Sequence, residues 1–247
     1  MPVDQLENPC IRTKLLRLDE EIDDDFFRLL ERLRAGEITV EAFQAATLEF
    51  LENLRLSKTF SKVIAIAERS EDQHWLVRRH TDSCRYTILL YRVDKDKAQP
   101  PHQHHNLIST QVVISGHIHL REYERVRFGE DGKLELRLAR DAVLGPGDVI
   151  QASEWYRNVH WFSGEGGPAI ILQINSRGYE KAAFDENDDG PFGRRYLDPT
   201  HFGESGLISC EELDVAEAAR RFKNKPLSAF RAPDPEPCET APLTIAI

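Results

Sequence analysis

PPHQHHNLISTQVVISGHIHL, residues 100–120, holds five of the nine histidines in the chain. His102 and His104 are separated by one residue, and on a β-strand such residues project from the same face. Imidazole binds first-row transition metals through a neutral ring nitrogen, so two rings side by side need one or two further donors to close a site. Pro100 and Pro101 cannot donate to a central sheet ladder, which places the pair near the mouth of a sheet. The stretch therefore predicts a metal site built on β-strands.

A second histidine pair, His117 and His119, shows the same spacing further along the stretch. No further ligand pattern surrounds it, and such pairs also occur on solvated strand faces. We expect this second pair to lie on the surface.

From Tyr86 onward the hydrophobic pattern has the period of β-strands. Short segments rich in β-branched and aromatic residues are separated by glycine, proline and acidic turns. They read YTILLYRV, TQVVISGHIHLREYERV, KLELRLARDAVL, DVIQAS and AIILQINS. A set of short strands of this kind is typical of a small barrel or sandwich. Glu130-Asp131-Gly132 is predicted to form a hairpin turn between Arg127 and Leu134.

The part of the chain before these strands is predicted to be helical. Residues 17–35 place apolar side chains at helical spacing, with acidic residues toward the N-terminal end and Gly36 as a stop. Thr39 can cap a second helix, and a third apolar stretch covers residues 60–67. We expect these apolar faces to pack on the strands.

The C-terminal part is predicted to contain an acidic loop, a short helix and an extended tail. Residues 185–190 imitate the start of a calcium-binding loop, but Tyr196 stands where a bidentate glutamate is needed. We therefore expect this segment to form a mobile loop at the rim of the active site and not to bind calcium. Ser209 and Glu212 have capping-box spacing before an amphipathic helix. Residues 232–243 read as the tail.

Composition limits the classes of partner. The chain of 247 residues is 40% hydrophobic, which is enough for one main domain with a sizeable core. A net charge of -10 argues against a nucleic-acid or anionic membrane surface, because phosphate contacts require clustered lysine and arginine. No run reaches the roughly 18 apolar residues of a membrane helix.

The four cysteines predict a reducing compartment. Cys10, Cys84, Cys210 and Cys238 form no CxxC motif and no close pair. The first residues also lack a charged-then-apolar signal pattern. We therefore expect a cytoplasmic protein.

The spacing around the first histidine pair resembles the first motif of the cupin superfamily, G(X)5HXH(X)3-4E(X)6G. Four residues separate His104 from Ser109, and six separate Ser109 from Gly116. Ser109 stands where the family usually has a glutamate. The resemblance covers roughly residues 86–175 and implies a mainly β chain whose domain is a jelly-roll barrel.

The second cupin motif ends in a histidine on a later strand. Pro146-Gly147-Asp148 matches its turn and His160 its histidine, although the usual PXG step before the histidine is absent. The resemblance implies that His102, His104 and His160 hold a metal. It also implies a division into a helical region at 1–75, a cupin barrel at 76–183, and a C-terminal region at 184–247 with the short helix.

A three-histidine site without the glutamate is similar to that of the thiol dioxygenases, cysteine dioxygenase in particular. Replacing the glutamate leaves three neutral donors, so a divalent ion keeps its full charge and binds anions well. The resemblance implies ferrous iron, Fe(II). Zinc or nickel remains open, because three histidines also form a water-activating zinc site.

Substrate-binding residues follow from the same resemblance. In that family an arginine upstream of the first metal strand binds the substrate carboxylate, and Arg78 or Arg79 falls at about the matching distance. Two adjacent arginines also occur on solvated faces, which is the alternative for this pair. Ser109, Tyr86 and Trp161 are separately expected to line the pocket; for Trp161 packing in the core is the default role.

Three amides are candidate catalytic groups. The family's Ser-His-Tyr relay is replaced here by Ile171, Gln173 and Asn175. Gln173 and Asn175 share one strand face, and Gln111 shares the face of Ser109. These amides can orient a polar ligand but are poor proton shuttles.

The leading hypothesis is an oxidoreductase: a mononuclear, Fe(II)-dependent cupin dioxygenase that takes dioxygen and a small polar substrate such as a thiol. The alternatives are a zinc- or nickel-dependent hydrolase, isomerase or lyase, and a non-catalytic cupin that binds a metal or ligand. Cupins are often dimers, so the resemblance also admits a homodimer.

Overall fold

The computed structural model describes residues 20–69, 74–80, 85–129, 131–154, 156–179, 194–201 and 207–231. The helices are α1 (Glu20–Arg34), α2 (Val40–Leu56), α3 (Lys58–Ala67) and α4 (Val215–Phe222). The first strands are β1 (His74–His80), β2 (Arg85–Val93), β3 (Ala98–His104), β4 (Leu107–Ser115), β5 (Ile118–Phe128) and β6 (Leu134–Leu144). The later strands are β7 (Val149–Ala152), β8 (Val159–Gly164), β9 (Ala169–Arg177), β10 (Arg194–Asp198) and β11 (Ile208–Leu213).

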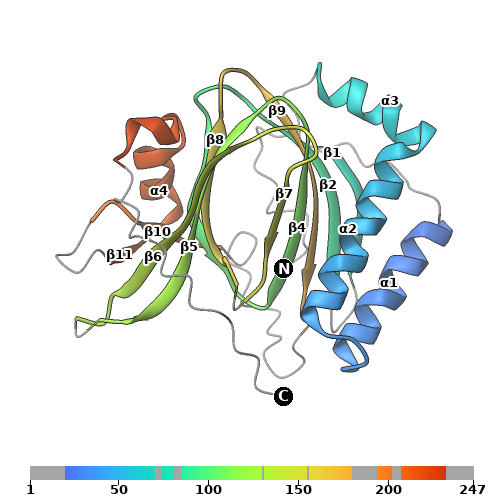
Figure 1. Cartoon of the computed structure of the whole chain (residues 1–247), viewed down its shortest axis with the longest axis horizontal. Coiled ribbons are helices and arrows are strands. Elements are labelled where there is room, and N and C mark those ends of the chain that lie inside the picture. Colours follow the sequence, from blue (N-terminus) through green and yellow to red (C-terminus); the bar gives the residue numbers. More distant parts are fainter. Residues whose placement is uncertain are drawn as a thin grey trace.

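Strands β2 to β9 pair in nested order. β5 pairs with β6, β4 with β7, β3 with β8, and β2 with β9, all antiparallel. Pairing of β4 with β9 and of β5 with β8 joins these strand pairs into two facing sheets, β2-β9-β4-β7 and β3-β8-β5-β6. Figure 1 shows the two sheets facing each other. Eight strands wound in this way form a jelly roll, which confirms the predicted mainly β fold.

Three further strands extend this jelly roll. β1 pairs with β2 at one edge, and β10 and β11 close a ring in the order β10-β11-β6-β5-β8-β3. The sequence did not predict β10 or β11. The predicted capping box is wrong, because Ser209 pairs with Glu135 inside β11 and the cap of α4 is Asp214, which accepts from the backbone N–H of Glu217 at 2.8 Å.

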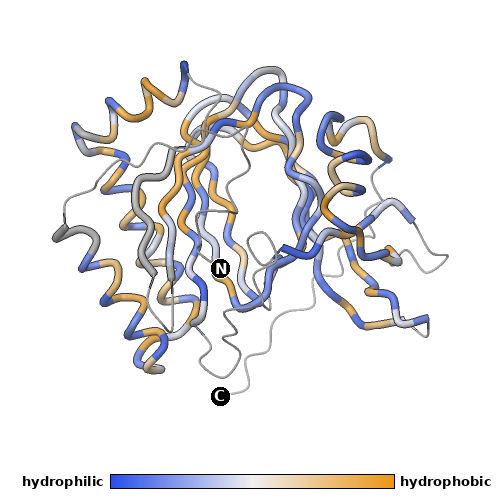
Figure 2. Tube along the Cα trace, turned by 180° about the vertical axis from the view of Figure 1, so that it is seen from behind, coloured by the Kyte–Doolittle hydropathy of each residue, from blue (hydrophilic) through white to orange (hydrophobic). Residues whose placement is uncertain are grey.

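The helices lie on opposite sides of the two sheets, α1 to α3 on one side and α4 on the other (Figure 1). The predicted cap of α2 is confirmed, since the hydroxyl of Thr39 accepts from the N–H of Ala42 at 3.2 Å. Phe26 of α1 packs against Tyr86 of β2 with ring centroids 4.8 Å apart. Hydrophobic residues, orange in Figure 2, run along the strands beneath these helices. The N-terminal helices thus cover the outer face of one sheet.

A second core fills the space between the sheets. Tyr91 of β2, Val113 of β4 and Ile171 of β9 contribute from one sheet, and Leu120 of β5 and Phe162 of β8 from the other. These residues define the inward face of each strand. Except at local bulges, a residue two positions before or after one of these residues also faces the interior.

The predicted turns lie between strands. Gly132 has φ +76° between β5 and β6, and Gly147 has φ +91° between β6 and β7. The N–H of Gly145 donates to Asp148 Oδ2 at 2.7 Å, which closes the Pro-Gly-Asp turn.

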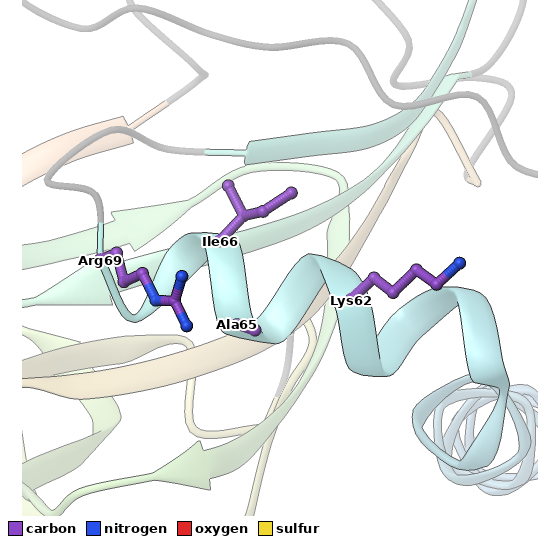
Figure 3. A pocket seen from close by; sticks show the side chains of 4 residues that line it. All are labelled: Lys62, Ala65, Ile66 and Arg69. Atoms are coloured by element: carbon purple, nitrogen blue, oxygen red, sulfur yellow. The ribbon is translucent and has the colours of Figure 1, made fainter.

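The outer surface of α3 carries a shallow hollow. It is lined by Lys62, Ala65, Ile66 and Arg69 (Figure 3). Lysine and arginine offer no lone pair to a metal, and α3 packs on the outer face of its sheet. None of the described helices is long and apolar enough to cross a membrane.

Candidate metal centre

Three buried histidines meet inside the jelly roll. His102 and His104 come from β3 and His160 from β8, and His102 stands directly opposite His160 in the strand pairing. One ligand nitrogen from each ring lies within 4.8 Å of the others. Within the described ranges no other group of histidine, cysteine and carboxylate side chains has this geometry. The structure therefore brings together the three ligands predicted from the sequence.

The three rings are held in the form that binds metals. Burial lowers the pKa of His102 and His104 well below 6.5 and that of His160 to about 4, and the positive charge of Arg194 acts in the same direction. Neutral imidazole carries a lone pair on one nitrogen. At neutral pH the cluster thus offers three uncharged nitrogen donors.

The hydrogen bond of His102 identifies its donor atom. Nδ1 lies 2.6 Å from the carbonyl oxygen of Pro100, which places the ring proton on Nδ1 and leaves the lone pair on Nε2. That Nε2 atom is buried and has no hydrogen-bond partner among the described residues. A buried, unpartnered nitrogen beside two others fits a metal ion, since a bound ligand histidine usually donates its second N–H to an oxygen.

Asn158 fixes the backbone of His104. Its Oδ1 accepts from the N–H of His104 at 2.7 Å, and its Nδ2 donates to the carbonyl of His104 at 2.8 Å. Asn158 lies between β7 and β8, two residues before His160. The same side chain therefore joins the strands that supply all three histidines.

The loop before β8 is held by a second polar contact. Glu154 accepts from the N–H of Asn106 at 2.8 Å through Oε2. Arg125 of β5 donates to Glu154 Oε1 at 3.1 Å. These bonds attach the loop to the turn after β3 and to β5, so the His160 end of β8 is fixed on both sides.

Polar side chains face the histidines from the opposite sheet. Ser109 pairs with Asn175 and Gln111 with Gln173 across β4 and β9, on the inward face shared with Val113. Gln173 Nε2 donates to Ser109 Oγ at 3.3 Å. The predicted amides and hydroxyl therefore share the interior with the cluster, as alternation along the strands indicated.

Gln111 already has a partner in the interior. The hydroxyl of Tyr91 donates to Gln111 Oε1 at 2.9 Å. This bond fixes the amide and leaves its Nε2 buried without a hydrogen-bond partner among the described residues. A ligand acceptor can meet this N–H.

Two predicted pocket residues lie elsewhere. Trp161 follows His160 on β8 and points to the other face, where its ring packs 5.1 Å from Phe222 and 4.7 Å from Phe230. Tyr86 packs under the helices against Phe26. Both expectations are corrected, because successive residues of a strand face opposite sides.

The predicted carboxylate arginines lie on β1, at the edge of the helix-covered sheet. Arg78 pairs with Thr87 and Arg79 with Tyr86 in the β1–β2 register. Their side chains lie outside the described residues, as do most residues of the 185–196 segment and three of the four cysteines.

The second histidine pair is separate from the cluster. His117 is exposed, and His119 Nε2 lies 2.5 Å from Asp141 Oδ1. Arg121 Nε donates to the other oxygen of Asp141 at 3.0 Å. This network accounts for His119 without a metal.

Two candidate functional residues, Arg194 and Glu122, were not predicted from the sequence. Arg194 of β10 pairs with His104 in the strand register and donates to Gln99 Oε1 at 3.2 Å. Its charge lowers the pKa of all three histidines and opposes the rise that burial causes in the pKa of Tyr91. Arg194 thus brings a positive charge toward the interior from a segment in which no strand was predicted.

Glu122 of β5 is the second missed residue. It stands opposite His160 in the β5–β8 register and is 0% exposed. Arg157 Nη1 lies 3.2 Å and Arg140 Nη1 3.5 Å from its Oε2 atom. Burial raises the pKa of this carboxyl, while the two arginines act in the opposite direction.

No protein-family model and no curated protein matches this sequence. Similar solved structures include KdgF from Halomonas sp., with 17% identity over 42% of this chain and 78% of that chain at a TM-score of 0.30. An uncharacterized protein with a double-stranded beta-helix domain from Klebsiella pneumoniae has 17% identity over 42% and 70%, at 0.30. A cupin 2 domain-containing protein from Halorhodospira halophila has 11% identity over 43% and 62%, at 0.31. At these values the assignment of the fold rests on the strand pairing itself.

Proposed function

We propose that this chain is a cupin-type, mononuclear metal-dependent oxygenase that holds Fe(II) with His102, His104 and His160. The observation that supports it is the cluster itself, three buried neutral imidazoles whose ligand atoms lie within 4.8 Å of one another. Bound ferrous iron would supply open positions at which substrate and dioxygen meet. The protein's own part is to bind, orient and shield the substrate.

A small anionic substrate, such as a thiol that binds as thiolate, fits the charge of this interior. The donors are neutral, and Ser109 supplies no carboxylate to offset the charge of a divalent ion. Arg194 adds a second positive charge on the same side. Both features favour a ligand that brings negative charge.

The amides of the opposite sheet suit orientation of this substrate. Gln111 is fixed by Tyr91, and Gln173 by Ser109. Neutral amides donate and accept hydrogen bonds without changing charge, so they hold a ligand rather than transfer its protons. Asn175 stands opposite Ser109 and belongs to the same polar surface.

The test is the metal content of anaerobically purified protein, measured by mass spectrometry for the wild type, His104→Ala and His105→Ala. His105 is the matched control, since it follows His104 directly but its side chain is 44% exposed. We expect near one iron per chain, lost in His104→Ala and kept in His105→Ala. Oxygen consumption with small thiols should then depend on that iron.

Other outcomes would favour the alternatives. Zinc or nickel in the wild type would indicate a hydrolase, isomerase or lyase, because three histidines also activate a metal-bound water. Stoichiometric metal without oxygen consumption would indicate a binding protein. Oxygen consumption that persists after iron removal would exclude the oxygenase.

A further inference from the structure

A row of side chains crosses the inner face of the sheet that carries the histidines. His102 of β3 stands opposite His160 of β8, His160 opposite Glu122 of β5, and Glu122 opposite Arg140 of β6. Directly opposed residues of antiparallel strands share one face, with Cα atoms about 5 Å apart. The carboxylate of Glu122 is therefore the neighbour of a metal ligand in this row.

The two oxygens of this carboxylate differ in their surroundings. Arg157 donates to Oε2 at 3.2 Å, and Arg140 lies 3.5 Å from the same atom. Oε1 is buried and has no hydrogen-bond partner among the described residues. An acceptor shielded from water without a donor costs free energy, which a donor from a bound molecule would recover.

Among the described residues, the groups next to Glu122 on the inward face do not supply that donor. Leu120 lies one pleat along β5, and Phe162 one pleat beyond His160 on β8; both belong to the apolar inner core. The two arginines are engaged with Oε2. On the other side of Glu122 in the row lie His160 and the candidate metal centre.

The backbone holds Arg157 in a conformation that suits this arrangement. Arg157 has φ +48°, in the left-handed region that non-glycine residues rarely adopt. In this conformation its guanidinium reaches the fully buried carboxylate, with Nη1 3.2 Å from Glu122 Oε2. Glu122 is thus fixed through one oxygen, with the other left available.

We propose that Glu122 determines specificity at this site: its Oε1 accepts a hydrogen bond from a hydroxyl or ammonium group of a small ligand whose other end faces His102 and His160. The ligand class is then a short molecule with a metal-binding anion at one end and a hydrogen-bond donor at the other. This inference rests on the metal centre proposed above, but on neither iron nor oxygen chemistry.

The experiment measures how tightly two matched pairs of probes bind the full chain loaded with Co(II), by absorption titration. The first pair is 2-aminoethanethiol and propane-1-thiol, and the second is 3-hydroxypropionate and butyrate. Within each pair the sizes match and one member carries the donor. Wild type, Glu122→Gln and Glu124→Gln are compared; Glu124 lies on the same strand but is exposed.

We expect the wild type and Glu124→Gln to prefer the donor-bearing probe by about tenfold or more, the range for hydrogen bonds to charged groups. In Glu122→Gln the arginines would retain the amide oxygen and turn its NH₂ group toward the ligand, so the preference should disappear. An equal preference in wild type and Glu122→Gln would overturn the inference, as would a wild type without preference in both pairs.

The thiol pair and the carboxylate pair of probes distinguish a failure of this inference from a failure of the proposed function. If neither thiol binds, but the preference for 3-hydroxypropionate over butyrate depends on Glu122, the proposal of a thiol substrate is rejected and the inference stands. If both thiols bind equally in wild type and Glu122→Gln, the metal centre stands and the inference fails. Should Glu122→Gln not fold, Glu122→Asp keeps the charge but withdraws it by one methylene, and an unchanged preference in that variant would overturn the inference.

Discussion

The side-chain amide of Asn158 exchanges two hydrogen bonds with the backbone of His104, accepting at 2.7 Å and donating at 2.8 Å. The two residues are 54 positions apart in the chain. Asn158 thereby connects β3, which carries His102 and His104, with the start of β8, which carries His160.

Replacement of Asn158 by alanine should weaken metal binding by about 10- to 100-fold, the usual effect of losing a group that orients a ligand. It should also lower the free energy of unfolding by roughly 1–3 kcal/mol, because buried backbone groups lose their partner. Metal competition titrations and urea unfolding measure the two effects. Asn224→Ala is the control, since the side chain of Asn224 accepts a hydrogen bond from exposed Lys97 at 2.7 Å. Wild-type metal affinity in Asn158→Ala would contradict the prediction.

Acid should destabilise the metal-free protein through the buried histidines. The folded state keeps them neutral, with the pKa of His160 at about 4, whereas the unfolded chain takes up protons below about 6.5. The free energy of unfolding should therefore be highest above pH 6.5, fall as the pH drops from there, and lose roughly 3 kcal/mol through His160 by about pH 4.

Urea unfolding at several pH values tests this expectation. His160→Gln should show a shallower dependence between pH 6.5 and 4. Identical slopes in wild type and His160→Gln would show that this histidine does not contribute.

Gly116, the last residue of the first motif, should not tolerate a side chain. It has φ +73°, and a Cβ atom there would lie 2.2 Å from the carbonyl oxygen of Pro168. Gly132 has φ +76° but no atom within 4 Å of its Cβ position. Gly116→Ala should therefore lower the free energy of unfolding by several kcal/mol and Gly132→Ala by only about 1 kcal/mol. Thermal unfolding of the two variants measures the difference. Equal losses would contradict the prediction, because they would mean that backbone strain alone matters.

The helix α4 should contribute stability without affecting the metal centre. Phe222 packs against Trp161 and Phe230 on the face of β8 that points away from His160. Phe222→Ala should cost about 3–5 kcal/mol through the cavity it leaves, while Val215→Ala, at an exposed position of the same helix, should cost little. Metal affinity measured on folded Phe222→Ala should stay at the wild-type value, and its loss would contradict the separation of the two faces.

The histidine cluster could be predicted in part because the signal of its first pair is local. His102 and His104 share a strand face by spacing alone, and His160 follows a recognisable turn. Strand-period segments between turns likewise predict a small barrel or sandwich. The resemblance to the cupins narrows this prediction to a jelly roll and points to His160.

The errors have physical causes. Every residue of β8 is buried, so hydrophobicity does not distinguish the face of His160 from the face of Trp161. β10 reads Arg-Arg-Tyr-Leu-Asp, with no strand period, and is a strand because β3 and β11 pair with it. Arg194 and Glu122 gain their significance from partners far along the chain, which no local pattern contains.

The nested strand pairing predicts an order of assembly. The hairpin of β5 and β6 closes across the few residues between Phe128 and Leu134, whereas β3 and β8 must bring together segments on either side of it. Closing a longer loop costs more chain entropy and slows the pairing. We therefore expect the histidines of β3 to meet His160 after β5 and β6 have paired and before β2 and β9, which enclose a still longer loop. Metal capture during refolding would then mark a late stage of barrel formation.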